Sequence, residues 1–121
     1  MSLKVTSTQK RPGVVTINPI GSIDSRTHTI LEEEVDAVLS EKPNVIIFDM
    51  EFLDYINSMG VRVLLKTKKQ IHKDDGKVIF IKLQTQIKKV FDILNALPTM
   101  QVFASIEEMD KYLDAMQKAA R

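Results

Sequence analysis

The stretch VIIFDMEFLDYINSMGVRVLL, residues 45–65, decides the fold of this chain. Residues 45–48 are all apolar and most are β-branched, which is typical of a strand buried on both faces of a parallel sheet. Asp49 ends this run. From Asn57 or Ser58 onward the apolar residues recur at helical spacing, which predicts an amphipathic helix. The residues expected on its core side are Val61, Leu64, Leu65 and Ile71.

The alternation of strand and helix continues toward the carboxyl end. Residues 74–76, DDG, predict a turn, and residues 78–81, VIFI, predict a second buried strand beside the first and parallel to it. A third helix follows and ends near Pro98, then residues 100–103 predict a short edge strand. Residues 105–108, SIEE, match a capping box that opens a last helix. The apolar faces of these two helices are Ile87, Val90, Phe91 and Leu94, and Ile106, Met109, Leu113 and Met116.

Toward the amino end the same signals predict a hairpin. Residues 3–8 alternate apolar and polar side chains, residues 11–14, RPGV, suit a type II turn, and residues 14–20 form the returning strand. Residues 29–32, TILE, match a capping box and open a first helix that continues to about Ser40. Its acidic side is expected to be a solvated face. That side carries Glu32, Glu33, Glu34 and Asp36.

The predicted order is therefore β-β-α-β-α-β-α-β-α. Strands separated by helices form right-handed parallel crossovers, and the opening hairpin makes the sheet mixed. We predict an α/β fold with four helices and one domain over residues 1–121, with its core over about residues 3–117. In such sheets function is expected in the loops at the carboxyl ends of the strands.

Composition narrows the class of function. The chain has 121 residues, with 44% hydrophobic and 27% charged residues and a formal net charge of +1. A near-neutral domain has no overall attraction for nucleic acid or anionic lipid. The absence of cysteine excludes disulfides, thiolate metal sites and cysteine nucleophiles. No apolar run is long enough for a membrane span and no signal-peptide core opens the chain, so the expected location is the cytoplasm.

The sequence lacks the usual catalytic constellations. His28 and His72 lie far apart, and neither has a second ligand at metal spacing. No phosphate-binding loop, dinucleotide fingerprint or nucleophile elbow is present. We therefore predict a binding or switching module with no catalytic residue, metal or cofactor. A small enzyme or nucleotide-binding protein of flavodoxin-like shape is the alternative from a different class.

The start of the helix after residue 57 carries the most informative polar groups. Asn57 can cap the free N–H groups of the first turn as well as Ser58 can, and with Asn57 as cap the Ser58 hydroxyl is free to face solvent. The alternative is that Ser58 is itself the cap. The spacing of a second set of residues predicts a solvent-facing side suited to a partner, or else scattered surface residues. That set is Met59, Arg62, Val63 and Lys66.

Two motifs in this order resemble the STAS domain family, the bacterial anti-anti-sigma factors. The family pattern runs from a buried strand ending in Asp to D-S-[SA]-G-[LV]-G and an apolar helix. Here it corresponds to the strand ending at Asp49 and to residues 57–60, NSMG. The family's earlier G-x-[LI]-D motif corresponds to residues 21–24, GSID. The order of elements agrees from about residue 3 to residue 117.

The resemblance implies an anti-sigma factor antagonist that works by partner switching. The unphosphorylated form would bind an anti-sigma factor that is also a serine kinase, the kinase would phosphorylate Ser58 and end the binding, and a PPM-type phosphatase would restore it. Asp24 would help form the docking surface, together with Asn57 and Gly60 of the second motif. Asp49 would support the backbone of the loop.

Two positions depart from the family pattern. Asn57 stands where the family usually has Asp, which keeps the capping geometry and removes a charge, and Arg62 stands where a second Gly is common. The alternative within the family is therefore a STAS scaffold or regulatory subunit that is not phosphorylated at Ser58. Such a subunit would serve a stressosome, a lipid-transport complex or another signalling assembly.

Overall fold

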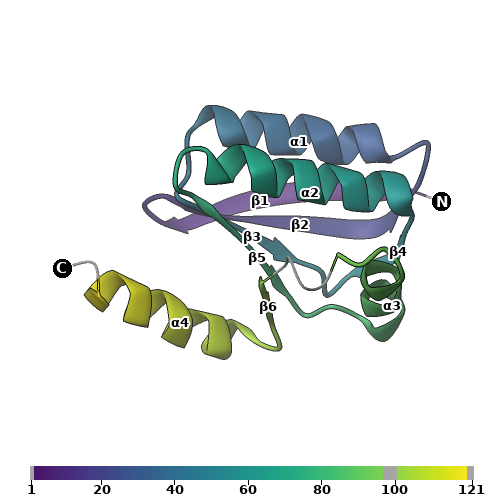
Figure 1. Cartoon of the computed structure of the whole chain (residues 1–121). Helices are drawn as coiled ribbons and strands as arrows, with labels where there is room; N and C mark the ends of the chain where they lie inside the picture. The colour runs from purple at the N-terminus through teal and green to yellow at the C-terminus, as the bar shows by residue number, and fades with distance from the viewer. Residues whose placement is uncertain (1, 97–100, 120–121) are drawn as a thin grey trace.

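The computed structural model describes residues 2–96 and 101–119, which form one mixed sheet with helices on both of its faces (Figure 1). The strands are β1 (Leu3–Arg11), β2 (Val14–Ile23), β3 (Val45–Asp49), β4 (Leu53–Ile56), β5 (Lys77–Ile81) and β6 (Gln101–Phe103). The helices are α1 (His28–Ser40), α2 (Ser58–His72), α3 (Thr85–Ile93) and α4 (Ile106–Ala119).

The strand order is β1-β2-β3-β5-β6, with β4 beside the carboxyl end of β2. The β1–β2 pair is antiparallel, and every other pair is parallel. Strand β3 is central, and Phe48 lies opposite Phe80 of β5 with their rings stacked at 5.3 Å. The predicted α/β fold, with its opening hairpin and parallel crossovers, is confirmed.

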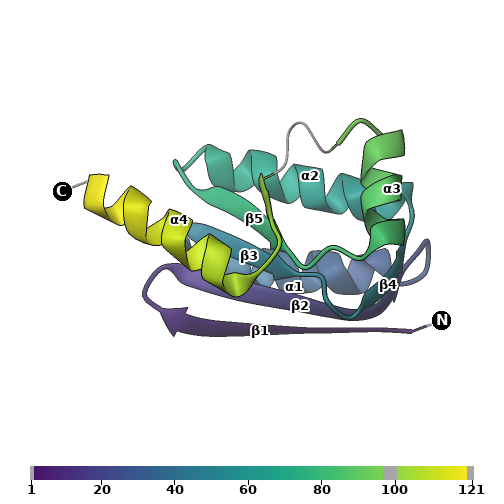
Figure 2. The same cartoon turned by 90° about the horizontal axis from the view of Figure 1, so that it is seen from below.

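The two faces of the sheet carry separate cores, which is why β3 and β5 are apolar at successive positions. Ile46 and Phe48 point to the core under α1, α2 and α3, whereas Val45 and Ile47 point to the core under α4. Figure 1 shows α1 and α2 side by side on one face, and Figure 2, seen from below, shows α4 crossing the other. Met109 and Leu113 of α4 close that second core.

Strand β4 lies between Asp49 and Asn57, where the sequence predicts neither a strand nor a helix. Its burial order is buried, exposed, exposed, buried, from Leu53 to Ile56. This order follows neither the alternation of a half-buried strand nor the continuous run of a fully buried one. Pairing with β2 creates the strand: Gly21 lies opposite Leu53, and an irregularity follows directly after Gly21.

The hairpin and the last helix agree with their predictions, and the first helix agrees in its end at Ser40 but not in its start. Gly13 has a φ of 75°, as the second central position of a type II turn requires. Ser105 Oγ accepts a hydrogen bond from Glu108 N at 3.1 Å, so this capping residue is confirmed. The capping box at residues 29–32 is wrong, because Thr29 lies inside α1. Pro98, Met100 and the side chain of Met116 lie outside the described residues.

Candidate functional site

Asn57 caps α2. Its side-chain oxygen accepts a hydrogen bond from Gly60 N at 3.1 Å, and its backbone has the extended conformation of a capping residue. Its own N–H donates to Ile23 O at 3.0 Å, which brings the start of α2 against the end of β2. The two sequence motifs therefore meet in space.

Ser58 is the first residue of α2 and is exposed. Within the described residues no hydrogen bond engages its hydroxyl, because Asn57 already satisfies the N–H group that a capping side chain would take. A free hydroxyl at a helix N-terminus is open to chemistry, and the partial positive charge of that end favours an anion there. The interpretation that Ser58 is spare agrees with this geometry.

Gly60 is buried, and only a glycine fits at its position. A Cβ atom there would lie 2.6 Å from Ile23 Cγ2 and 2.6 Å from Ile56 Cγ1. The first turn of α2 therefore packs its backbone directly on the ends of β2 and β4. This close approach holds Ser58 in a defined place relative to the loop after β2.

Asp24 organises the turn between β2 and α1. Its Oδ1 accepts hydrogen bonds from Arg26 N at 2.9 Å, Thr27 N at 3.0 Å and Thr27 Oγ1 at 3.2 Å. Thr27 is buried, and its single hydroxyl proton is shared between Asp24 Oδ1 and the nearer acceptor, Ser22 O at 2.7 Å. The backbone hydrogen bond from Arg26 is the largest cause that lowers the pKa of Asp24. Burial opposes this lowering, and the two hydrogen bonds from Thr27 add to it.

These hydrogen bonds explain why α1 starts before the predicted capping box. The buried Thr27, three residues after Asp24, was not predicted to matter. An Asp with Thr three residues later is a turn signal that the sequence does contain.

The side of α2 predicted to face a partner is only partly exposed. Met59 is 37% exposed, and Arg62 and Lys66 are exposed, but Val63 is 5% exposed. The prediction that Val63 faces solvent is wrong. Helix α1 lies against this side of α2, so Val63 belongs to the core, a burial that periodicity within one helix does not show.

A shallow hollow of about 210 Å³ lies between the two helices at this point. Sequence reasoning missed the α1 residues that face it, His28 and Glu32, because they come from a different element. Residues of both helices line it: His28, Glu32, Met59, Arg62, Val63 and Lys66.

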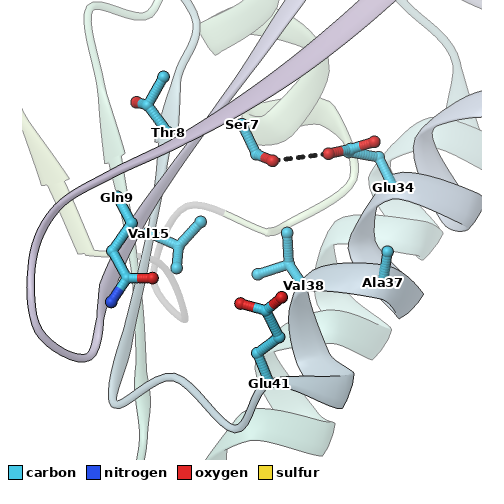
Figure 3. A pocket seen from close by; sticks show the side chains of 8 residues that line it. All are labelled: Ser7, Thr8, Gln9, Val15, Glu34, Ala37, Val38 and Glu41. Atoms are coloured by element: carbon cyan, nitrogen blue, oxygen red, sulfur yellow. Dashed lines mark hydrogen bonds between the residues drawn. The ribbon is translucent and has the colours of Figure 1, made fainter.

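A second hollow, of about 180 Å³, lies on the opposite side of α1, against β1. Figure 3 shows Ser7 of β1 and Glu34 of α1 pointing toward each other, with Ser7 Oγ donating to Glu34 Oε1 at 2.7 Å. Glu34 is therefore held on the β1 side of the helix, away from α2. In the described part of the chain, no cluster of three or more His, Asp or Glu side chains is suited to a metal ion.

The loop before α2 is held by side chains from several elements. Asp49 Oδ1 accepts from Glu51 N at 3.1 Å, in agreement with its predicted role as a support of the backbone. Gln84 Nε2 donates to Glu51 O at 2.7 Å, and Gln86 Nε2 donates to Asp54 O at 3.1 Å. The two glutamines at the start of α3 thus each bind one carbonyl of the segment from Glu51 to Asp54.

Comparison with known proteins assigns the family. Residues 6–109 match the STAS domain, so the chain belongs to the STAS domain family. BtrV of Bordetella bronchiseptica, a candidate anti-sigma factor antagonist, is 31% identical over 87 residues, which are 72% of this chain and 75% of BtrV. The predicted resemblance is confirmed.

Solved structures show the same fold. An anti-sigma factor antagonist from Mycobacterium paratuberculosis superposes with a TM-score of 0.79 at 19% identity, over 88% of this chain and 90% of that one. Unphosphorylated SpoIIAA superposes with a TM-score of 0.78 at 19% identity, over 92% and 97%. The phosphorylated form of SpoIIAA, from Bacillus, gives 0.70 at 19% identity, over 90% and 99%.

The name of BtrV describes an antagonist of an anti-sigma factor, which agrees with the prediction of a binding module. Within residues 2–96 and 101–119, no helix has both the length and the apolar character that a membrane crossing needs.

Proposed function

We propose that this protein is an anti-sigma factor antagonist in a partner-switching pathway. Its unphosphorylated form binds an anti-sigma factor that is also a serine kinase, and phosphorylation of Ser58 by that kinase ends the binding. A PPM-type phosphatase then restores the binding form. The observation that carries this proposal is the exposed Ser58 hydroxyl, which the Asn57 cap leaves without a structural task.

A phosphate at Ser58 changes the surface more than the fold. It adds roughly −1.5 to −2 charges at pH 7. The N-terminus of α2 stabilises such an anion by about 0.3–1 kcal/mol, so the modified protein stays folded. SpoIIAA, which has the same fold, is known in both unphosphorylated and phosphorylated forms, and this supports a switch that acts without unfolding.

The proposed partner surface surrounds Ser58. Met59, Arg62 and Lys66 would contact the partner directly, because all three are exposed on one side of α2. Gly60 and Val63 are buried and would not contact the partner. They would affect binding by holding α2 in position against its neighbours. Asn57 and Asp24 would hold the α2 start and the loop beside it, joined through the backbone hydrogen bond from Asn57 N to Ile23 O.

The test is a phosphorylation assay with the anti-sigma kinase recovered with this protein by affinity capture and mass spectrometry. Incubation with ATP should add one phosphate, which peptide mapping should assign to Ser58. Ser58→Ala should abolish the modification, and Ser25→Ala, at another exposed serine nearby, should leave it unchanged. Binding of the kinase should fall when Ser58 is phosphorylated. Modification at another residue only would overturn the proposal.

The second candidate, a STAS scaffold without phosphorylation, is favoured by one observation. Asn57 removes the carboxylate that the family usually places beside the serine, so a kinase that reads this charge would act poorly here. This candidate predicts a stable complex in which Ser58 stays unmodified in the presence of kinase and ATP. The assay above therefore separates the two candidates directly.

A further inference from the structure

The two helices on one face of the sheet carry opposite charges. Helix α1 has four carboxylates and no Lys or Arg between His28 and Ser40, whereas α2 has no carboxylate between Ser58 and His72. The charged residues are Glu32, Glu33, Glu34 and Asp36 on α1, and Arg62, Lys66, Lys68 and Lys69 on α2. Figure 1 shows these helices side by side, so an acidic strip lies next to a basic one.

Among the described residues, no ion pair joins α1 to α2. The ion pairs of the described residues join Arg11 to α4 and Lys82 to the loop after β3, and none includes a residue of α1 or α2. Glu34 is turned toward Ser7 of β1, as Figure 3 shows. The outward-facing charges of both helices are therefore available to another molecule. The exposed ones are Glu33, Asp36, Arg62, Lys66 and Lys69.

The two strips also lie at the same level along the helices. The hollow between α1 and α2 brings Glu32 of the first helix to the level of Arg62 and Lys66 of the second. Both helices begin at this end, next to the carboxyl ends of β2 and β4, so they run in parallel (Figure 1). One turn further on, Asp36 is therefore level with Lys69 or close to it.

We propose that two copies of this chain pair through this face, about a two-fold axis parallel to α1 and α2. A rotation about such an axis exchanges the positions of α1 and α2 across the face. It leaves the position of each residue along the helix axes unchanged. It therefore places α1 of each copy on α2 of the other, with Glu33 and Asp36 opposite Lys66 and Lys69. A different protein needs the mirrored charge pattern to fit here, whereas a second copy always has it.

This pairing is independent of the proposed function and has a consequence for it. The shared face includes Met59 and lies next to Ser58, so a paired molecule has its switch surface covered. Because exposed charges are screened by salt, the pairing is weak and reversible, and it weakens as ionic strength rises. A second copy of the chain and any other partner then compete for the same surface of α2.

Sedimentation of the purified full chain tests the proposal. At about 20 mM salt the apparent mass should rise from 13.8 kDa toward twice that value with concentration, and at about 0.5 M salt it should stay near 13.8 kDa. Two charge-reversed variants, Glu33→Lys with Asp36→Lys and Lys66→Glu with Lys69→Glu, should each self-associate about tenfold more weakly. The matched control is Lys88→Glu with Lys89→Glu, at exposed positions of α3, which should behave as wild type.

The decisive measurement is a mixture of the two reversed variants. In each variant, residues 33 and 36 of α1 carry the same sign of charge as residues 66 and 69 of α2, so pairing with an identical copy is weakened. Between the two variants these positions are opposite in sign, so each complements the other. Mixing them should restore association to about the wild-type level. A chain that remains at 13.8 kDa under all conditions, or a dimer that charge reversal leaves intact, overturns the proposal. If a reversed variant does not fold, the salt dependence of wild-type association decides.

Discussion

Asn57 Oδ1 accepts a hydrogen bond from Gly60 N at 3.1 Å, and this single contact separates the structural task at the start of α2 from the chemical one. Where a serine is the capping residue of a helix, its hydroxyl accepts a hydrogen bond from a backbone N–H of the first turn. Here the preceding asparagine takes that task, so the Ser58 hydroxyl is free. Because Asn57 caps the helix and Ser58 does not, replacing each residue should affect stability differently.

Asn57→Ala should destabilise the protein, and Ser58→Ala should not. Loss of the capping oxygen leaves a helix N–H group without its partner, which costs about 1 kcal/mol. Ser58 loses no hydrogen bond, so its replacement should change the free energy of unfolding by less than about 0.5 kcal/mol. Urea denaturation of both variants measures the difference. Equal losses would mean that Ser58 shares the cap.

Gly60→Ala should destabilise the fold although alanine favours helices. The added methyl group would lie 2.6 Å from side-chain atoms of Ile23 and Ile56, and relief of this overlap costs about 1–3 kcal/mol. Thermal denaturation measures the loss. Adding Ile56→Val, which removes a methyl group near the overlap, should recover part of the stability, so the two changes should be less than additive. A stabilised Gly60→Ala variant would contradict the close packing of α2 on β4.

Phosphate at Ser58 should interact with Arg62 within the same molecule. The two residues are four apart on one helix, which makes their side chains neighbours, and an arginine binds a phosphate through two parallel hydrogen bonds. Because both groups are exposed, the coupling should be only about 0.3–1 kcal/mol. Arg62→Gly should then widen the difference in partner affinity between the unphosphorylated and phosphorylated forms. Affinities of the four species give the coupling, and a value of zero would show that the groups ignore each other.

Gln84 and Gln86 should protect β4 from local unfolding. Each donates one side-chain hydrogen bond to a carbonyl of the segment from Glu51 to Asp54, and each such bond contributes about 0.5–1.5 kcal/mol. Replacing both by alanine should speed amide hydrogen exchange in residues 53–57 by about tenfold, with little change in β3. Gln70→Ala, at an exposed position on α2, is the control. Unchanged exchange in β4 would show that the glutamines do not hold it.

Stability should depend on pH through Asp24. Hydrogen bonds from Arg26 and Thr27 lower its pKa in the folded protein below the unfolded value of about 3.9. The charged form is therefore the stabilising one. Its contribution is fully present above the unfolded pKa and is lost as pH falls through the lower, folded pKa.

Asp24→Asn should consequently have a lower midpoint of thermal denaturation than wild type at pH 7. The gap between the two proteins should narrow as pH falls below about 4. Ser25→Ala, in the same turn, has no titrating group and should show a difference from wild type that does not change with pH. A gap between Asp24→Asn and wild type that is constant with pH would contradict the role of the charged carboxylate.

Some features of this protein could be predicted from sequence because they depend on local pattern. The apolar runs in β3 and β5 predict burial on both faces of the sheet. The two cores, one on each face, confirm this prediction. Asn57 followed by an amphipathic run predicts the start of α2, because a capping residue and the helix it begins are neighbours in the chain. With Asn57 as the cap, the same signals predict that the Ser58 hydroxyl is free.

Other features were decided by tertiary contacts, because the groups that cause them are distant in sequence. Strand β4 exists because Gly21 of β2 lies opposite Leu53, and the local burial pattern alone does not indicate it. Val63 looks exposed on an isolated helix and is buried because α1 packs against that side of α2. The acidic strip of α1 and the basic strip of α2 could be read from sequence as separate faces. Only the packing of both helices on one side of the sheet places opposite charges next to each other.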